Sequence, residues 1–296
     1  MTVRILQFGV TGQLARELLG QAKDFDVEIT ALSRAEADFA DPAACADEVR
    51  GRAFDLVVIA AAYTAVDQAE TDEEAAHRVN CLTPSAIAAA AHAAQIPVVF
   101  ISTDYVFSGD KGAPYAETDP VGPINVYGKT KLDGETAVLE QAARSLILRT
   151  SWVVSSHGKN FIKTMLRLAG EGKSLTVVDD QYGRPTAARD LARFILSQAG
   201  RLAKAPVGDP AFGVHHFANA GEETWRSFAQ GIFEIALGAA APPVAAGAYP
   251  VPAKRPARGT LDTRKLETTF GVTLRPWREP VAEIVAELQF HERSAA

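Results

Sequence analysis

The first fifteen residues limit the possible folds more than any other stretch. Residues 3–8 (VRILQF) form a short apolar run typical of a strand, and GVTGQLARELL follows at once, with Gly9, Gly12 and Ala15 three residues apart. This order predicts a strand, a tight turn and a helix. The first glycine suits the turn, and the second lets the backbone approach a pyrophosphate, which the N–H groups of the first helical turn can bind. Because a glycine can also simply end a strand, this interpretation depends on the rest of the chain.

Further apolar runs predict a parallel sheet. They lie at residues 27–32, 54–62, 97–107 and 214–221, and the alanine-rich stretch 80–92 predicts one of the intervening helices. Strands of this kind alternate with helices in doubly wound proteins, whose sheets are covered on both faces and bind ligands at the carboxyl ends of the strands. We therefore predict an α/β fold with a Rossmann-type, doubly wound parallel sheet.

The second half of the chain predicts a smaller α/β domain that binds substrate. Helical spacing of apolar residues at 160–169 and 279–293 supports it, and the stretch 236–262, rich in Ala, Pro and Gly, predicts irregular structure within it. The substrate would lie in the crevice between the domains. The predicted boundaries are a dinucleotide-binding domain at 1–152, to which the chain returns at about 184–219, and a substrate domain at 153–183 and 220–296.

Composition excludes several classes of protein. The 296 residues carry a formal charge of −6, which argues against nucleic acid as a partner, because duplex binding needs a basic face. No apolar run approaches the length of a membrane span. Cys45 and Cys81 lack metal-ligand spacing, so we predict small buried side chains in a reducing compartment, the cytoplasm. His215 and His216 are neighbours on a predicted strand, so one should be core and the other surface.

The pentapeptide YGKTK contains the candidate proton donor. Tyr127 and Lys131 are four residues apart, so on a helix they share one face. An ammonium group near the phenol would lower the tyrosine's pKa from its usual value of about 10. We therefore predict that Lys131 tunes Tyr127 as a general acid. Thr103 follows a predicted buried strand, at the edge of the sheet where catalytic groups are expected.

The end of the second strand predicts the cofactor. NAD enzymes usually carry an acidic residue there, whereas this chain has Ser33 and Arg34. A guanidinium suits a ribose 2′-phosphate, so we predict that NADPH is favoured. A solvated surface position for Arg34 is the alternative. Asp38 can contact the adenosine and allow NADH as well.

Five motifs carry a family resemblance: STDYVF at 102–107, NVYGKTK at 125–131, RTSWV at 149–153, NFIKTMLRLA at 160–169 and DQYGRPT at 180–186. With AAAYTAVDQAE at 60–70, they resemble the dTDP-4-dehydrorhamnose reductase family of the extended short-chain dehydrogenases/reductases. The resemblance extends from residue 3 to about 277. It implies reduction of the C4 ketone of dTDP-4-dehydro-6-deoxy-L-mannose by NAD(P)H to dTDP-L-rhamnose, the last step of dTDP-rhamnose synthesis for surface polysaccharides.

The resemblance also implies residue roles. Tyr127 would be the proton donor, Lys131 would hold the cofactor ribose, and Thr103 would take the Ser/Thr position of the triad. Substrate contacts are implied for Thr64, Val66, Asp67, Thr103, Asp104, Trp152 and Arg255. Cofactor contacts are implied for Gly9, Thr11, Gly12, Gln13, Leu14, Ser33, Arg34, Asp38, Phe39, Ala60, Ala61, Ala62, Asn80, Tyr127 and Lys131. Within the basic cluster Lys254, Arg255 and Arg258, Arg255 belongs to an Arg-Pro pair like that of the family and is a candidate for the diphosphate.

Two alternative functions remain open. Another nucleotide-sugar epimerase, reductase or dehydratase would share the fold, although a dehydratase needs an Asp-Glu pair where this chain has Asp104 and Tyr105. A non-catalytic, NADP-binding regulatory member would not need the intact triad.

Some family members are described as metal-bridged dimers that use glutamates. Here Arg189 stands where such a carboxylate is expected and Glu17 alone would bind Mg²⁺ weakly, so we predict no structural metal. A homodimer is an open expectation.

Overall fold

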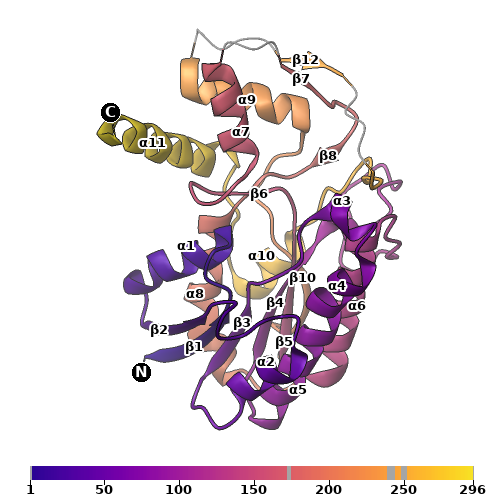
Figure 1. Ribbon diagram of the computed structural model, residues 1–296, viewed down its shortest axis with the longest axis vertical. Helices are drawn as coiled ribbons and strands as arrows, with labels where there is room; N and C mark the ends of the chain where they lie inside the picture. Colours follow the sequence, from indigo (N-terminus) through magenta and orange to yellow (C-terminus); the bar gives the residue numbers. More distant parts are fainter. Residues whose placement is uncertain (1, 172–174, 239–243, 248–251, 296) are drawn as a thin grey trace.

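The computed structural model describes residues 2–171, 175–238, 244–247 and 252–295, with side chains described as far as 290. Its centre is a parallel sheet in the order β2-β1-β3-β4-β5-β10 (Figure 1). The order reverses direction between β1 and β3, which makes the sheet doubly wound and confirms the predicted fold class. Its strands are β1 (Val3–Phe8), β2 (Val27–Leu32), β3 (Leu56–Ile59), β4 (Val98–Thr103), β5 (Ser145–Thr150) and β10 (Gly213–His216).

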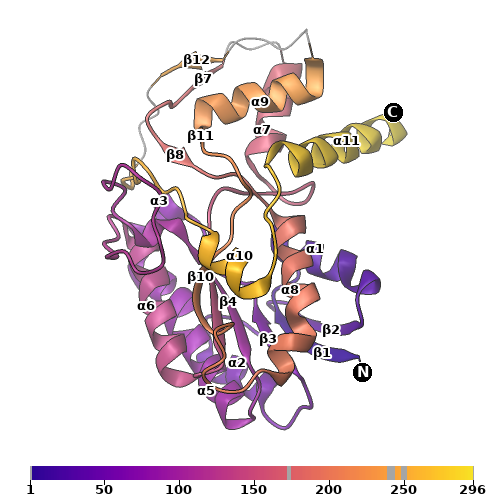
Figure 2. The same cartoon turned by 180° about the vertical axis from the view of Figure 1, so that it is seen from behind.

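Helices bury both faces of the sheet (Figures 1 and 2). Alternate strand residues enter opposite cores: Val58 packs with one layer of helices, whereas Val57 and Ile59 pack with the other. The first layer contains α1 (Gln13–Gln21), α8 (Ala188–Lys204) and α10 (Arg264–Phe270). The second contains α2 (Pro42–Val49), α5 (Thr83–Ala93) and α6 (Val126–Gln141). Shorter helical segments are η1 (Ala22–Asp24), α3 (Val66–Ala69), α4 (Glu73–His77), η2 (Arg78–Leu82) and η3 (Asp104–Val106).

A further hydrophobic core, separate from the two on the faces of the sheet, lies beyond the carboxyl ends of the strands (Figure 1). Met165, Phe233 and Ile284, from three different helices, belong to it, in keeping with the predicted substrate domain. The domain boundaries stay a prediction. The elements here are β6 (Val153–Val154), α7 (Phe161–Gly170), β7 (Thr176–Val177), β8 (Tyr182–Gly183), β9 (Thr186–Ala187), β11 (Glu223–Thr224), α9 (Trp225–Leu237), β12 (Ala245–Ala246) and α11 (Arg278–Ala295).

Several predicted strands are shorter than their apolar runs. The run at 54–62 forms only β3, because Ala60 to Ala62 leave the sheet as a loop. The run at 97–107 ends as a strand at Thr103 and continues as η3. Of the predicted irregular stretch 236–262, residues 239–243 and 248–251 lie outside the described part of the chain. Across the described residues, every helix is either too short or too polar to span a lipid bilayer.

Both histidines of β10 are buried, so the prediction of one core and one surface histidine was wrong. The His215 ring packs edge-on to Phe270 of α10, and the His216 ring packs edge-on to Phe107 and lies 3.1 Å from the Asp262 carbonyl oxygen. Phe270, later in the sequence, covers one face of this edge strand, and Phe107, earlier in the sequence, covers the other. Burial lowers the pKa of His215 to about 4 and that of His216 to about 3, which keeps both rings neutral at pH 7. Cys45 and Cys81 are free and buried, as predicted.

Gly134 provides a test of how closely the elements pack. A Cβ at this position of α6 would lie 2.0 Å from the Asn80 carbonyl oxygen, which is backbone and cannot rotate away. We expect Gly134→Ala to lower the free energy of unfolding by about 1–3 kcal/mol, although alanine has the better helix propensity. Gly200→Ala in α8 is the matched control, because its nearest neighbour is 4.0 Å away. Urea unfolding should show a gain of about 0.5–1 kcal/mol for the control; equal effects of the two changes would contradict the packing.

Candidate active site

The glycine turn after β1 has the geometry of a dinucleotide cradle. Gly9 has φ of +101°, and a Cβ there would lie 3.3 Å from the Ala61 Cβ. Gly12 is the N-cap of α1 and offers no side-chain acceptor to the N–H groups of the first helical turn. These groups therefore suit an external anion. Because β1 and β3 flank the reversal of strand order, the turn and the loop at 60–62 lie where ligands bind in such sheets. The residues present fit a dinucleotide pyrophosphate.

The other predicted residues of this turn differ in what they can offer. Thr11 is exposed, whereas the Leu14 side chain is buried in the core, so only its backbone is free to contact a ligand. The Gln13 amide donates to the Val153 carbonyl over 3.1 Å and so links α1 to β6. Phe39 is buried against Phe8 with ring centroids 5.7 Å apart. It is a packing residue at the edge of the cradle.

Asn80 positions the loop beside the cradle. It lies in the π-helix η2 and is completely buried. Its side-chain oxygen accepts the Tyr63 N–H at 2.9 Å, and its amide donates to the Tyr63 carbonyl and to the Thr130 hydroxyl, both at 3.1 Å. Both amide protons are therefore used within the protein. The structure indicates that Asn80 fixes the loop that begins at Ala60 against α6.

Thr103 and Tyr127 are brought together from two elements. Thr103 is the last residue of β4, and Tyr127 lies in the first turn of α6, so that the Thr103 hydroxyl is close enough to lower the pKa of the phenol. Asn125 caps this helix by accepting the Gly128 N–H at 2.7 Å. A Cβ on Gly128 would lie 2.1 Å from the Tyr105 carbonyl oxygen, so this glycine lets α6 approach η3. The donor and its hydroxyl partner thus sit on rigid elements.

Lys131 shares the helix with Tyr127 but has other partners. Its ammonium nitrogen donates to the Ile101 carbonyl over 2.6 Å and lies 3.9 Å from the centroid of the Phe100 ring. Burial lowers the pKa of Lys131 to about 7, and the nearby charge of Glu135 opposes that shift.

The predicted lowering of the tyrosine's pKa by Lys131 was wrong for this geometry. Burial raises the pKa of Tyr127 to about 12, and the group that counteracts it is the Thr103 hydroxyl. An ammonium group bonded to the Ile101 carbonyl exerts no comparable effect. Tyr127 is therefore neutral and carries its proton at pH 7, as a proton donor must.

Asp104 follows Thr103 directly and begins η3. It is buried, accepts from the Thr103 hydroxyl at 3.1 Å, and approaches Gly259 so closely that a Cβ there would be 2.3 Å from its Oδ2. Burial raises the pKa of Asp104 to about 7, with Thr103 opposing the shift. A carboxyl of this kind can donate or accept a hydrogen bond near neutral pH.

Trp152 belongs to an aromatic cluster with Trp225 and Phe228. It adopts a positive φ of 46°, which is rare for a non-glycine residue, and stacks on Trp225 with centroids 3.7 Å apart. Gly183 of the DQYGRPT motif leaves room for it, because a Cβ there would lie 2.6 Å from the indole. Both tryptophans are partly exposed, so the cluster can offer an apolar, stacking face to a ligand.

The predicted diphosphate cluster divides between two places. Arg255 pairs with Asp67 over 3.0 Å, and its guanidinium lies 6.0 Å from the Tyr105 ring, which itself packs edge-on to Tyr127. Arg258 instead pairs with Glu222 over 3.5 Å. Of these two arginines, Arg255 is the one held near Tyr127. Of the other predicted contacts, Thr64 is exposed, Val66 begins α3 and Lys254 is exposed.

The sequence patterns missed a buried ion pair below the site. The Arg149 guanidinium contacts Glu135 at 2.6 Å, and the Ser102 hydroxyl donates to the same carboxylate. Both partners of the ion pair are almost completely buried. Its one signal in the sequence is the spacing of Glu135, four residues after Lys131, which places it on the same inward face of α6.

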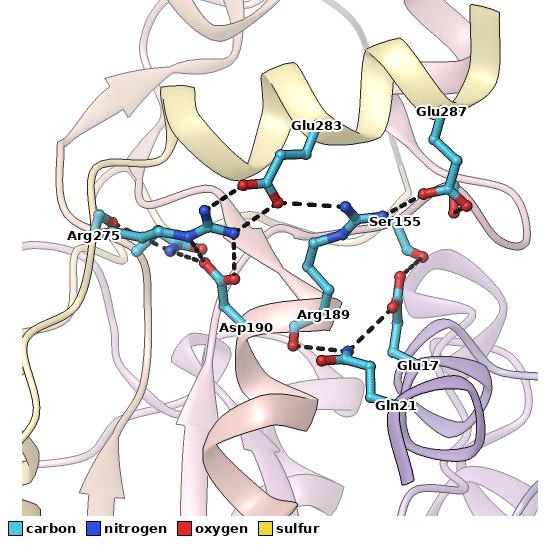
Figure 3. Close-up of polar contacts among 10 residues, drawn as sticks. Glu17, Gln21, Ser155, Arg189, Asp190, Arg275, Glu283 and Glu287 are labelled. Carbon is cyan, nitrogen blue, oxygen red and sulfur yellow. Dashed lines mark hydrogen bonds and ion pairs between the residues drawn. The ribbon is translucent and has the colours of Figure 1, made fainter. Parts of the chain in front are cut away.

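Arg189 lies among carboxylates (Figure 3). It contacts Glu283 at 3.4 Å and also pairs with Glu287, both on α11, while Glu17 of α1 accepts the Ser155 hydroxyl at 2.6 Å. Arg275 extends this network, because it pairs with Asp190 at 2.7 Å and also with Glu283. Within the described part of the chain, no group of three or more His, Cys, Asp or Glu side chains could hold a metal ion.

The absence of a structural metal stays a prediction with a direct test. Because the Arg189 guanidinium neutralises Glu283 and Glu287, we expect neither EDTA nor millimolar Mg²⁺ to change the Tm or the elution volume of the protein. Arg189→Ala should lower the Tm by a few degrees, since it leaves Glu287 without its counter-charge and Glu283 with Arg275 alone. A rise in the wild-type Tm with Mg²⁺ would contradict this prediction.

The buried Asp104 predicts a pH dependence of stability. The folded protein keeps this proton up to about pH 7, whereas an ordinary aspartate loses it near pH 3.8. Between those values the folded state binds more protons, so this group makes the free energy of unfolding fall as pH rises. We expect Asp104→Asn to gain about 2–3 kcal/mol relative to wild type between pH 5 and pH 8. Urea unfolding at both pH values measures this, and His215 and His216 titrate equally in the two proteins. A pH-independent difference would contradict an elevated pKa.

The chain matches a known family over almost its whole length. The model described as the RmlD substrate binding domain matches residues 3–290. The dTDP-4-dehydrorhamnose reductase of Sinorhizobium fredii is 41% identical over 298 residues, covering 99% of this chain and 100% of that protein. The corresponding reductase of Escherichia coli K12 is 42% identical, covering 97% of this chain and 98% of that protein.

Solved structures agree with this match. A dTDP-4-dehydrorhamnose reductase of Clostridium acetobutylicum gives a TM-score of 0.89 at 35% identity, covering 97% of this chain and 100% of that chain. The dTDP-4-dehydrorhamnose reductase of Bacillus anthracis, in complex with NADP, gives a TM-score of 0.88 at 30% identity with the same coverage. The chain therefore belongs to the RmlD family, together with these dTDP-4-dehydrorhamnose reductases.

Proposed function

We propose that this protein reduces the C4 ketone of dTDP-4-dehydro-6-deoxy-L-mannose to give dTDP-L-rhamnose, using NADPH and, less well, NADH. The observation that carries this proposal is the pairing of Thr103 with Tyr127 at the edge of the sheet that also holds the glycine cradle. The names of the relatives supply the substrate, and the NADP complex of the Bacillus anthracis reductase supports the cofactor.

In the proposed mechanism one residue donates the proton, and the others bind the substrate oxygen and the cofactor. The reduced nicotinamide supplies the hydride. As negative charge develops on the ketone oxygen, Tyr127 donates its phenolic proton to that oxygen, and Thr103 redirects its hydroxyl proton from Asp104 to hold the same oxygen by a hydrogen bond. A phenol with a pKa of about 12 keeps its proton until that charge develops, so the donor is loaded at neutral pH. Lys131 would hold the cofactor ribose with its ammonium group.

Substrate binding is assigned to the region between the two cores. Asp104 lies within reach of the reacting end of a sugar held by Thr103 and Tyr127, because it hydrogen-bonds to Thr103. The stacked rings of Trp152 and Trp225 suit an apolar face of the ligand. Arg255 would exchange its bond to Asp67 for the diphosphate. Thr64 and Val66 stay candidate contacts on the facing loop.

The alternatives differ in what they require of these residues. A non-catalytic regulatory protein would not need Thr103 and Tyr127 in contact. A dehydratase would need a second acid next to Asp104, whereas Tyr105 stands there and packs against Tyr127. Oxidation of NADPH on addition of the keto sugar nucleotide separates the reductase from both.

The cellular setting is part of the same proposal. The free, buried Cys45 and Cys81 are in keeping with a reducing compartment, so we place the reaction in the cytoplasm. The product would feed polysaccharide biosynthesis. A homodimer is proposed without a metal bridge, and neither nucleic acid nor a membrane is proposed as a partner.

Tyr127→Phe tests the proton donor. We expect kcat to fall at least about a hundredfold with the Kd for NADPH nearly unchanged, because the change removes a proton and little binding surface. Lys131→Ala should lower kcat and also weaken the binding of NADPH. Tyr115→Phe is the matched control, since its hydroxyl accepts the Gly109 N–H at 3.0 Å in a structural turn; it should retain near-normal kcat. Stopped-flow oxidation of NADPH measures these effects, and near-normal turnover by Tyr127→Phe would refute the mechanism.

A further inference from the structure

The turn after β2 lies directly beside the glycine cradle. Phe8 and Leu32, the last residues of β1 and β2, are paired in the sheet, and the Gly9 N–H donates to the Leu32 carbonyl at 2.9 Å. Ser33 is therefore the first residue beyond the strand on this edge. In a doubly wound sheet, the adenosine ribose of a bound dinucleotide is read at this position.

The donors in this turn already face carboxylates of the same chain. The Ser33 N–H and the Ser33 hydroxyl both donate to one oxygen of Glu36, at 2.8 and 2.7 Å. Arg34 lies 3.5 Å from Asp38, and its side chain is 85% exposed. An anion that used these groups would meet Glu36 first, because Glu36 holds two donors of Ser33 at once.

Glu36 is ionised at neutral pH. The Ser33 N–H and hydroxyl lower the pKa of its carboxyl below the usual value. The sequence Ser-Arg-Ala-Glu, residues 33–36, has the form of a capping box, in which the glutamate supports the turn. The backbone also holds this turn, because the Glu36 and Ala37 N–H groups donate to the Ser33 carbonyl at 3.1 and 2.9 Å. If the carboxylate charge is removed, these backbone hydrogen bonds therefore still hold the turn.

We propose that Glu36 determines cofactor specificity by competing with a ribose 2′-phosphate for the donors of Ser33. This inference rests on the proposed function, since it concerns the cofactor of that reaction. A 2′-phosphate must displace the carboxylate or lie beside a like charge, and either lowers its affinity. The 2′-hydroxyl of NADH is neutral and can donate to Glu36. The carboxylate thus opposes the preference for NADPH that Arg34 provides, and the two residues together set the ratio.

The test measures nucleotide binding directly. Dissociation constants of NADP⁺ and NAD⁺ are determined by calorimetry at pH 7.5 and about 0.15 M salt for the wild type and for Glu36→Gln. Glutamine keeps the size and one acceptor while removing the charge. We expect the ratio of Kd for NAD⁺ to Kd for NADP⁺ to rise about three- to fivefold. The fragments 2′,5′-ADP and 5′-ADP should show the same change, which locates the effect at the 2′ position.

Two controls make the outcome specific. Glu28→Gln removes an exposed carboxylate near the other end of β2 and should leave the ratio unchanged. Arg34→Ala should shift the ratio in the opposite direction, toward NAD⁺. If wild type binds both nucleotides and Glu36→Gln leaves their ratio unchanged, or changes it no more than Glu28→Gln, the inference about Glu36 is overturned while the proposed function stands. If wild type binds neither nucleotide, the proposed function itself fails.

Discussion

The close contact of α6 with its neighbours is the constraint on which the site depends. Two glycines make it possible, because a Cβ at Gly128 or Gly134 would lie about 2 Å from a backbone carbonyl oxygen of η3 or η2. With that contact, Tyr127 reaches Thr103 at the end of β4. The same approach buries the face of α6 that carries Lys131 and Glu135. The geometry of the candidate site and the burial of charge therefore arise from one packing arrangement.

Burial then sets the protonation states in the site. Away from water the charged form of each group is disfavoured, so the pKa of Asp104 rises and that of Lys131 falls, both to about 7. Burial raises the pKa of Tyr127, which therefore stays protonated at pH 7. At pH 7 Asp104 and Lys131 are therefore each only partly ionised, and the ion pairs Arg149–Glu135 and Arg255–Asp67 carry no net charge. Such a site favours a group that releases its proton only when charge appears on the substrate.

Local patterns in the sequence predicted local structure well. The strand, glycine turn and helix at residues 3–21 follow from apolar spacing and two glycines, and the order of strands and helices follows from alternating apolar runs. Contacts between distant segments were not predictable. His215 is buried because α10 covers it from about fifty residues later, and Lys131 turns to the Ile101 carbonyl rather than to Tyr127. Spacing along one helix defines a shared face, but tertiary contacts decide where a long side chain bonds.

Ion pairs, and not apolar contacts alone, join the sheet and its covering helices to the segments that form the separate hydrophobic core of Met165, Phe233 and Ile284. Arg255 reaches Asp67 across 188 residues of sequence, and Arg189 joins α8 to α11 within the network of Figure 3. Partly exposed ion pairs contribute little net free energy, because water competes for both partners. An anionic ligand can replace Asp67 at Arg255 with small loss, whereas the hydrophobic cores on each side stay intact. If the proposed function holds, exchange of these ion pairs would admit a nucleotide sugar between the cores without unfolding either one.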